Sequence, residues 1–237
     1  MITIKTVKSE LEKHVDFKRA EHAPRFFKTG KGEYGEGDQF LGVAVPDQRK
    51  VARKFYAEID EDVLGDLLVD PIHEVRLTAV FMLVEKFKKA KGHDAKERWV
   101  KLYLKKWKGI NNWDLVDSSS HLILGKWLED KPRDLLYEFA ESDDLWKQRI
   151  AMIATMHFIR QNEFTDALAI AEILLRHEHD LIHKAVGWML REIGNRDQNV
   201  EEAFLKKYYQ EMPRTALRYA IEKFPDDRRK AYLNGYV

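Results

Sequence analysis

The sequence of 237 residues contains no cysteine, only 6 prolines and 12 glycines, and no long apolar run. The absence of cysteine excludes a disulfide framework and any chemistry that needs a thiolate. No stretch approaches the roughly 20 apolar residues that a membrane helix needs, and "MITIKTVKSELEKHVDF" has no apolar core of signal-peptide length. We therefore expect a cytoplasmic protein without a membrane segment. The net charge of +1 does not by itself indicate a polyanionic partner, so the distribution of charge matters more.

Apolar residues recur with helical spacing along almost the whole chain. Val51 and Phe55 are four residues apart behind Pro46, which suits a first helical turn. Asp70 is predicted to cap the next helix and Pro71 to begin it. Further helices are predicted at 119–129, 133–141, 143–161, 164–176, 180–193, 199–210 and 213–224. No segment alternates convincingly over the length of a strand, so the sequence predicts an all-α fold.

Several of these helices resemble one another. "HEVRLTAVFMLVEKF", "WKQRIAMIATMHFI", "LIHKAVGWMLREIG" and "PRTALRYAIEKF" share a basic residue followed by small and apolar positions. The gap between Arg76 and Arg149 is about twice the gap between Arg149 and Lys184, and the segment at Trp113 falls near the missing unit. A period of about 35–45 residues with two helices per unit is typical of helical solenoids. We therefore predict one helical-repeat domain over 1–237, curved so that it presents a concave face.

The region "KTGKGEYGEGDQFLGVAVP" is the one glycine-rich part of the chain. Gly30, Gly32 and Gly35 formally match a dinucleotide-binding fingerprint, but that motif needs a strand before it and a helix directly after it. Neither is predicted here, and no Gly-Lys-Ser/Thr completes a phosphate loop. We interpret 28–45, including its glycine-rich part at 30–42, as a long loop inserted between helices. Loops of this length are often functional.

Positive charge is concentrated just before the middle of the chain. Between Lys86 and Lys108 only Asp94 and Glu97 oppose a run of lysine and arginine residues. Such a run usually forms a solvated helix face. The sharper hypothesis is phosphate binding, because clustered lysines release counterions from nucleic acid.

This basic tract leads directly into "GINNWDLVDSSSHLILGKWL". Trp113 and Asp117 are four residues apart, so a helix places both on one face. A lone tryptophan is more often a core residue than part of a ligand site, whereas an aspartate is a poor core residue unless it is paired. Asp114 points elsewhere and is free to cap or to hydrogen-bond backbone. We therefore expect Asp117 to be the carboxylate held beside an aromatic face.

Two other groups of residues give weaker indications of a functional site. His179 and His183 have a spacing that can bind zinc, but the segment is not His-Glu-x-x-His and no third ligand follows. We expect a histidine cluster without metal. The serines at 118–120 have no distinguishable base partner, which argues against nucleophilic hydrolase chemistry. The sequence thus indicates neither a metal site nor a cofactor.

Four segments in order, "FLGVAVPDQRK", "NNWDLVDSSS", "SDDLWKQRIAMI" and "HKAVGWMLREIG", resemble the AlkD-like DNA alkylation-repair glycosylases. The resemblance runs from about residue 20 to residue 224. It implies an α-solenoid of HEAT-like repeats with a concave DNA-binding face. It also implies excision of positively charged N3- and N7-alkylated purines, such as 3-methyladenine and 7-methylguanine, from duplex DNA. That reaction hydrolyses the N-glycosidic bond in base excision repair, without a cofactor, and we expect a monomeric enzyme.

The resemblance also implies the site residues. The family's catalytic aspartate matches Asp117, and the aromatic residue four positions before it matches Trp113. The arginine and the second tryptophan match Arg149 and Trp188. The departure lies near the N-terminus, where some members carry a tyrosine in place of Phe26–Phe27 and a shorter loop follows. Residues expected to bind the DNA backbone are Arg49, Lys101, Lys105, Lys106, Lys108 and Lys184.

Two alternatives stay open. Helical-repeat solenoids are commonly scaffolds for proteins or nucleic acids, and fold does not fix function. In that reading Trp113, Arg149 and Trp188 are core or contact residues and Asp117 is a structural cap. A zinc hydrolase that uses His179 and His183 is the more distant alternative.

Overall fold

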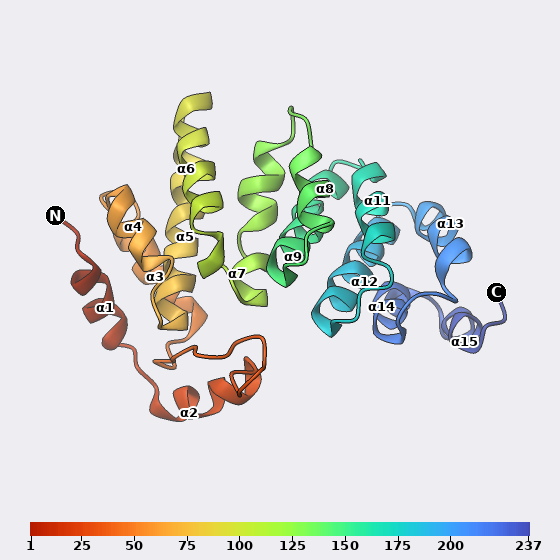
Figure 1. Ribbon diagram of the computed structural model, residues 1–237, viewed down its shortest axis with the longest axis horizontal. Helices are drawn as coiled ribbons and strands as arrows, with labels where there is room; N and C mark the ends of the chain where they lie inside the picture. Colours follow the sequence, from red (N-terminus) through yellow and green to blue (C-terminus); the bar gives the residue numbers. More distant parts are fainter. The chain divides into compact units, whose positions relative to one another are not determined.

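The computed structural model describes all residues 1–237 and is helical throughout (Figure 1). Its only β-type pairing is an isolated parallel bridge between Gln39 and Ile72. The chain divides into two compact units, Met1–Ser119 and Ser120–Val237. The all-α prediction is confirmed.

The first unit is organised around one long buried helix. Its elements are α1 (Ile4–Glu12), α2 (Phe17–Phe26), α3 (Val45–Phe55), α4 (Glu61–Leu67), α5 (His73–Lys89), α6 (His93–Lys105), a 3₁₀ turn (Trp107–Gly109) and α7 (Trp113–Asp117). Helix α5 packs against α3, α4 and α6, and most of its residues are buried. A helix that is apolar around most of its circumference belongs at the centre of a packed unit, so α5 forms the core on which the shorter helices rest.

The start of α5 differs from the prediction. The helix begins at His73, and its N-cap is Ile72 rather than Asp70. The carboxylate of Asp70 accepts hydrogen bonds from the Ile72 amide at 2.9 Å and from Lys8 Nζ at 2.7 Å. Asp70 therefore closes a turn before the helix and ties it to α1, and the predicted cap at Asp70 with a start at Pro71 is wrong. The predicted place of Pro46 in the first turn of a helix is confirmed, since α3 begins at Val45.

The loop between α2 and α3 lies where the sequence predicts an insertion. It is held on α5 by polar contacts: the His73 amide donates to the Gln39 carbonyl at 2.8 Å, and the Glu74 carboxylate accepts from the Gly42 amide at 2.7 Å. Gly42 has a φ of 77°, and a Cβ there would lie 2.1 Å from the backbone oxygen of the residue that caps α2. Only glycine allows this close approach. The loop is thus fixed to the helix that supports it.

The second unit is built around α12 (Asp180–Gly194), which packs against α9, α13 and α14. The remaining elements are a π-helical turn (His121–Gly125), α8 (Asp134–Ala140), α9 (Leu145–Ala154), α10 (Met156–Ile159), α11 (Thr165–Ile173), α13 (Gln198–Tyr208), α14 (Arg214–Ala220), a 3₁₀ turn (Ile221–Lys223) and α15 (Asp226–Asn234). The helix predicted at 143–161 is divided at Thr155, and α15 was not predicted. The other predicted helices of this unit correspond to observed elements within a few residues.

Two glycines show the same packing device in successive parts of the second unit. A Cβ on Gly125 would lie 2.4 Å from the Ala154 carbonyl oxygen, and one on Gly187 would lie 2.3 Å from the Ala216 carbonyl oxygen. Each glycine thus lets the backbone of a later helix approach closely. The separation along the chain between the glycine and the approaching residue is the same in both pairs. This recurrence supports the predicted helical repeat.

Replacing Gly187 by alanine should lower the free energy of unfolding by about 1–3 kcal/mol, because the new methyl group meets backbone that cannot move cheaply. Gly65→Ala is the matched control: it also lies in a helix, but its nearest neighbours are the flexible side-chain ends of Lys106 and Leu102 at 3.1 and 3.3 Å. Urea unfolding of both variants measures the difference. Equal stability of the Gly187 variant and the parent would contradict the close packing of α12 and α14.

Candidate functional site

Helix α7 is a single turn that carries both Trp113 and Asp117. Its N-cap is the fully buried Asn112, whose side-chain oxygen accepts from the Trp113 amide at 2.9 Å. Leu115 and Val116, in the middle of the turn, are completely buried, whereas Trp113 and Asp117 at its ends are half-buried. The predicted arrangement of these two residues one turn apart on a helix is therefore present.

A second group of contacts holds the end of α7. The Ser119 hydroxyl donates to the Leu115 carbonyl at 2.7 Å and lies 3.2 Å from the hydroxyl of Tyr103. Burial raises the pKa of Tyr103, and the negative charge of Asp117 adds to that rise. Tyr103 therefore stays a neutral hydrogen-bonding group, and Ser119 connects α7 to α6.

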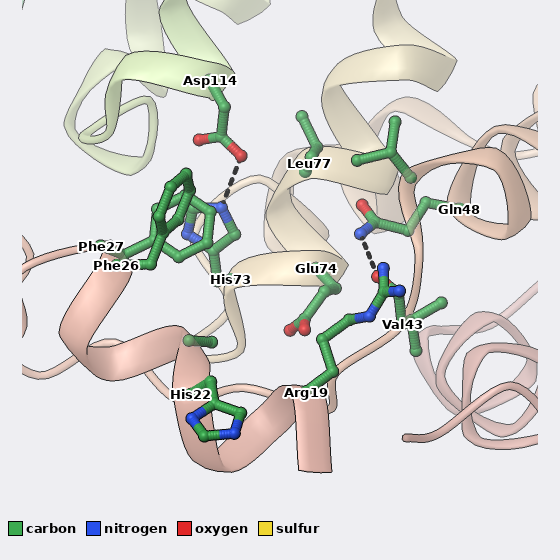
Figure 2. A pocket seen from close by; sticks show the side chains of 12 residues that line it. Arg19, His22, Phe26, Phe27, Val43, Gln48, His73, Glu74, Leu77 and Asp114 are labelled. Carbon is green, nitrogen blue, oxygen red and sulfur yellow. Dashed lines mark hydrogen bonds and ion pairs between the residues drawn. The ribbon is translucent and has the colours of Figure 1, made fainter. Parts of the chain in front are cut away.

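An aromatic cluster surrounds Trp113. Its ring stacks on Phe27 with centroids 5.7 Å apart and meets the edge of Phe26, also at 5.7 Å. Phe27 in turn stacks on Phe40 at 5.3 Å. Its ring also lies 4.4 Å from the imidazole of His73, and Figure 2 shows these two side chains together. Phe26 is 64% exposed although it is a large apolar side chain. The end of α2 and the following loop thus build an aromatic surface beside Trp113.

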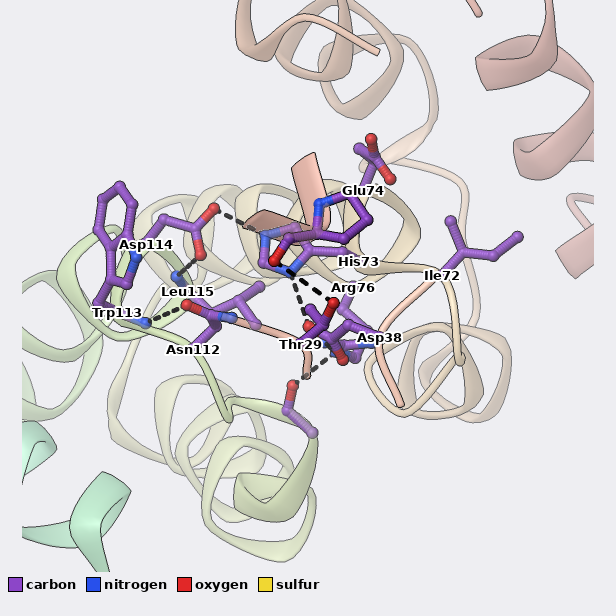
Figure 3. Close-up of polar contacts among 12 residues, drawn as sticks. Thr29, Asp38, Ile72, His73, Glu74, Arg76, Asn112, Trp113, Asp114 and Leu115 are labelled. Atoms are coloured by element: carbon purple, nitrogen blue, oxygen red, sulfur yellow. Dashed lines mark hydrogen bonds and ion pairs between the residues drawn. The ribbon is translucent and has the colours of Figure 1, made fainter. Parts of the chain in front are cut away.

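His73, at the first position of α5, lies between two carboxylates (Figure 3). Its Nε2 is 2.8 Å from Asp114 Oδ2, and its Nδ1 is 3.1 Å from Asp38 Oδ2. Both ring nitrogens face acceptors, so both carry protons and the ring is an imidazolium. Burial by itself would lower the pKa of His73, but the hydrogen bonds to Asp114 and Asp38 and the charge of Asp114 outweigh burial and raise the pKa to about 9.

Arg76 completes this network one turn further along α5. It donates to Asp38 Oδ1 at 2.7 Å, to the Asp70 carbonyl at 2.8 Å and to the Gly109 carbonyl at 3.1 Å. Burial acts to raise the pKa of Asp38, but the hydrogen bond from His73 and the charge of Arg76 hold it below its ordinary value. The two buried cations and the two carboxylates balance, which is the condition under which buried ions are tolerated.

The histidine gives the first unit a definite pH dependence. Its folded pKa of about 9 lies above the ordinary value of 6.5, so between these values the folded state binds more protons than the unfolded state. The contribution of His73 to the free energy of unfolding should therefore be fully present below pH 6.5 and fall by up to about 3 kcal/mol as the pH rises through 9. His73→Gln should flatten this dependence, and the exposed His14→Gln should not. Urea unfolding at several pH values measures it, and parallel curves for parent and His73→Gln would refute the assignment.

A cavity of about 390 Å³ adjoins the network in the first unit. Its walls are largely apolar and include Phe26, Phe27 and Leu77, with His73, Glu74 and Asp114 supplying polar groups (Figure 2).

No group of three histidine, aspartate or glutamate side chains in the chain has the arrangement of a metal site. Around His179 the ring nitrogens serve the backbone instead: His179 Nδ1 accepts from the Leu181 amide at 3.1 Å, and His177 Nδ1 accepts from the His179 amide at 2.9 Å.

The two remaining site residues lie in the second unit. Arg149 is in α9 and only 4% exposed, and its guanidinium donates to the Leu181 carbonyl. Trp188 is in α12 and half-buried, and its indole N–H donates to Glu192 at 3.0 Å. The burial of Arg149 leaves little of its guanidinium accessible to a phosphate, whereas Trp188 keeps part of its ring exposed.

The predicted DNA-binding cations lie at the surface of their units. Lys101, Lys105 and Lys108 are exposed, and Lys101 pairs with Glu97 at 2.9 Å within α6. Lys106 is half-buried beside Asp66 at 3.6 Å. The other two members are Lys184, paired with Asp180 at 2.7 Å, and Arg49, which lies over the ring of Phe81 at 3.9 Å.

The sequence patterns do not predict the His73 network. The segment "HEVR" has only the pattern of the start of a repeat, and Asp38 lies in a segment that is predicted to be a loop. The available signal was a histidine and an arginine one turn apart in an otherwise apolar helix, since buried ionisable residues must find partners.

The chain belongs to the DNA alkylation repair enzyme family, whose sequence profile matches residues 7–224. Its fold is similar to that of a solved structure described as a predicted DNA alkylation repair enzyme from Enterococcus faecalis. The two share 14% sequence identity with a TM-score of 0.70, over 90% of this chain and 98% of the other. No curated protein sequence matches it significantly. None of its helices has the length and apolar character required to span a bilayer.

Proposed function

We propose that the protein is a DNA glycosylase that excises N3- and N7-alkylated purines from duplex DNA by hydrolysis of the N-glycosidic bond. Membership of the DNA alkylation repair family supports the general task. The proposal of this specific reaction rests on the position of Asp117. Its carboxylate is half-buried and lies one turn from Trp113, on a helix whose middle residues are buried. The family resemblance of the segment around these two residues supports the same assignment.

The chemistry suits a carboxylate without a general acid. Alkylation at N3 or N7 gives the purine a formal positive charge, so the base leaves as a neutral molecule and needs no proton. The enzyme then has to stabilise the cationic sugar and to direct a water to its anomeric carbon. A fixed carboxylate does the first electrostatically and accepts a proton or hydrogen bond from that water. In the proposal Asp117 has both roles.

The aromatic residues recognise the lesion in this proposal. Trp113 and Trp188 offer ring faces to the cationic nucleotide, each contributing about 0.5–2 kcal/mol depending on solvation. The burial of Arg149 favours a role in holding its own segment over direct contact with a phosphate. The exposed lysines of α6 and the turn after it bind the backbone of the DNA. We propose that the enzyme acts in the cytoplasm as a monomer.

Product analysis tests the proposal. Incubation with alkylated duplex DNA should release free methylated purines and leave an intact strand with an abasic site, because no lysine nucleophile takes part. Mass spectrometry of the released bases and gel analysis of the strand measure both products. Borohydride should trap no protein–DNA adduct, and a trapped adduct would contradict hydrolysis by an activated water. Tight DNA binding without any base release would instead favour a non-catalytic scaffold.

A further inference from the structure

Helix α7 cannot fix its own direction. It has five residues, and an isolated helix of this length is unstable in water. Its orientation therefore depends on the contacts that its ends make with α5, α6 and the loop after α2. Since Trp113 and Asp117 are its first and last residues, any rotation of this turn moves both side chains.

One of these contacts differs from the others in charge. Ser119 and Asn112 hold α7 through neutral hydrogen bonds. Asp114 instead spans a backbone amide and a cation: Oδ1 accepts from the Leu115 amide at 2.9 Å, and Oδ2 lies 2.8 Å from His73 Nε2. A charge-assisted hydrogen bond is about twice as strong as a neutral one.

The same histidine supports the aromatic surface. Its ring lies 4.4 Å from Phe27 and 5.2 Å from Phe40, and Phe27 stacks directly on Trp113. On the other edge of the imidazole, His73 Nδ1 faces Asp38. Asp38 is itself fixed by Arg76, whose guanidinium lies 2.7 Å from the Asp38 carboxylate. His73 thus joins the loop, α5 and α7 at one point.

We propose that His73 is a positioning residue that directs Trp113 and Asp117 toward the lesion by bridging Asp38 and Asp114 beneath the Phe27 ring. This inference rests on the proposed glycosylase function. His73 itself does not contact DNA, because its side chain is 2% exposed.

The bridge requires the doubly protonated ring. Loss of one proton would turn a ring nitrogen into an acceptor opposite a carboxylate oxygen, which removes one hydrogen bond and adds repulsion. The charged groups that face His73 are Asp38 from the loop, Asp114 from α7 and Arg76 from its own helix. Arg19, His22 and Glu74 line the adjoining cavity.

Fluorine NMR of the full chain labelled with 5-fluorotryptophan gives a direct readout. The Trp113 resonance is assigned by its loss in Trp113→Phe. In the parent it should shift as the pH passes about 9, the pKa of His73. In Asp114→Asn the midpoint should move to lower pH, and in His73→Gln the transition should disappear. His157→Gln, which removes a half-buried histidine 3.3 Å from Glu129, is the matched control and should leave the Trp113 resonance unchanged.

Activity at neutral pH gives the second readout. His73→Gln and Asp114→Asn should slow single-turnover excision about 10- to 100-fold, the scale of a slight misplacement of reacting groups. Their dissociation constants for DNA should stay within about twofold of the parent, because neither residue lies among the backbone-binding cations. His157→Gln should excise at the parental rate.

The two readouts separate the inference from the proposed function. If the chemical shift of Trp113 changes neither with pH nor on substitution of Asp114, the positioning role of His73 is overturned, whatever the activity. If the parent excises nothing, the proposed function fails while the fluorine titration still decides whether His73 orients α7. Asp114→Asn keeps this test available should His73→Gln not fold.

Discussion

Replacing Asp117 by asparagine should slow excision of N7-methylguanine about 10- to 1,000-fold, equivalent to about 1.4–4 kcal/mol of transition-state stabilisation. Asparagine keeps the shape and the hydrogen-bonding capacity of the side chain but removes its negative charge. The half-buried position of Asp117 at the end of α7 strengthens the effect, since water screens the charge less there than on an exposed surface.

The affinity of this variant for DNA should hold or rise, because a charge that repels phosphate has gone. Asp62→Asn, an exposed aspartate in α4 of the same unit, is the matched control and should excise at the parental rate. Single-turnover kinetics with enzyme in excess, beside a direct binding curve, separates the two effects. An Asp117→Asn variant as fast as the parent would show that the carboxylate is a structural cap.

Reversing Lys101, Lys105 and Lys108 together to glutamate should weaken binding to every duplex, damaged or not, by about 100-fold near 0.15 M salt. Each lost phosphate contact removes about 0.9 from the slope of log affinity against log salt. The expectation rests on the exposure of these three side chains, of which Lys101 is paired only with Glu97 of its own helix.

The same reversal of charge at exposed Lys206, Lys207 and Lys223 of the second unit is the control for net charge. It should change binding much less, because only long-range electrostatics is altered. Fluorescence anisotropy at several salt concentrations gives both affinity and slope. Binding that ignores salt, or an equal loss in both triple variants, would contradict phosphate binding by this segment.

The sequence predicted those features that depend on local periodicity. The helical spacing of Val51 and Phe55 behind Pro46 identifies α3, and the four-residue spacing of Trp113 and Asp117 places them on one turn. These predictions succeed because the helix period is a property of neighbouring residues.

The features that the sequence did not predict correctly depend largely on partners distant in the chain. Asp70 reads as a helix cap, but the ammonium of Lys8 and the Ile72 amide occupy its carboxylate and delay the helix. The bridge from His73 to Asp38 and Asp114 crosses more than thirty residues in each direction and has no periodic signature. Ion pairs between residues so far apart in the sequence can be identified only in the folded structure, where the backbone brings the side chains together.

Excision from a defined duplex that carries a single N7-methylguanine is the most direct test of the central claim. With enzyme in excess, free 7-methylguanine should appear in a single exponential phase, well above spontaneous depurination, until one base is released per lesion. The matched duplex with unmodified guanine should release none. Saturated binding of the lesion duplex with release no faster than spontaneous depurination would contradict the assignment of this protein as an alkylpurine DNA glycosylase.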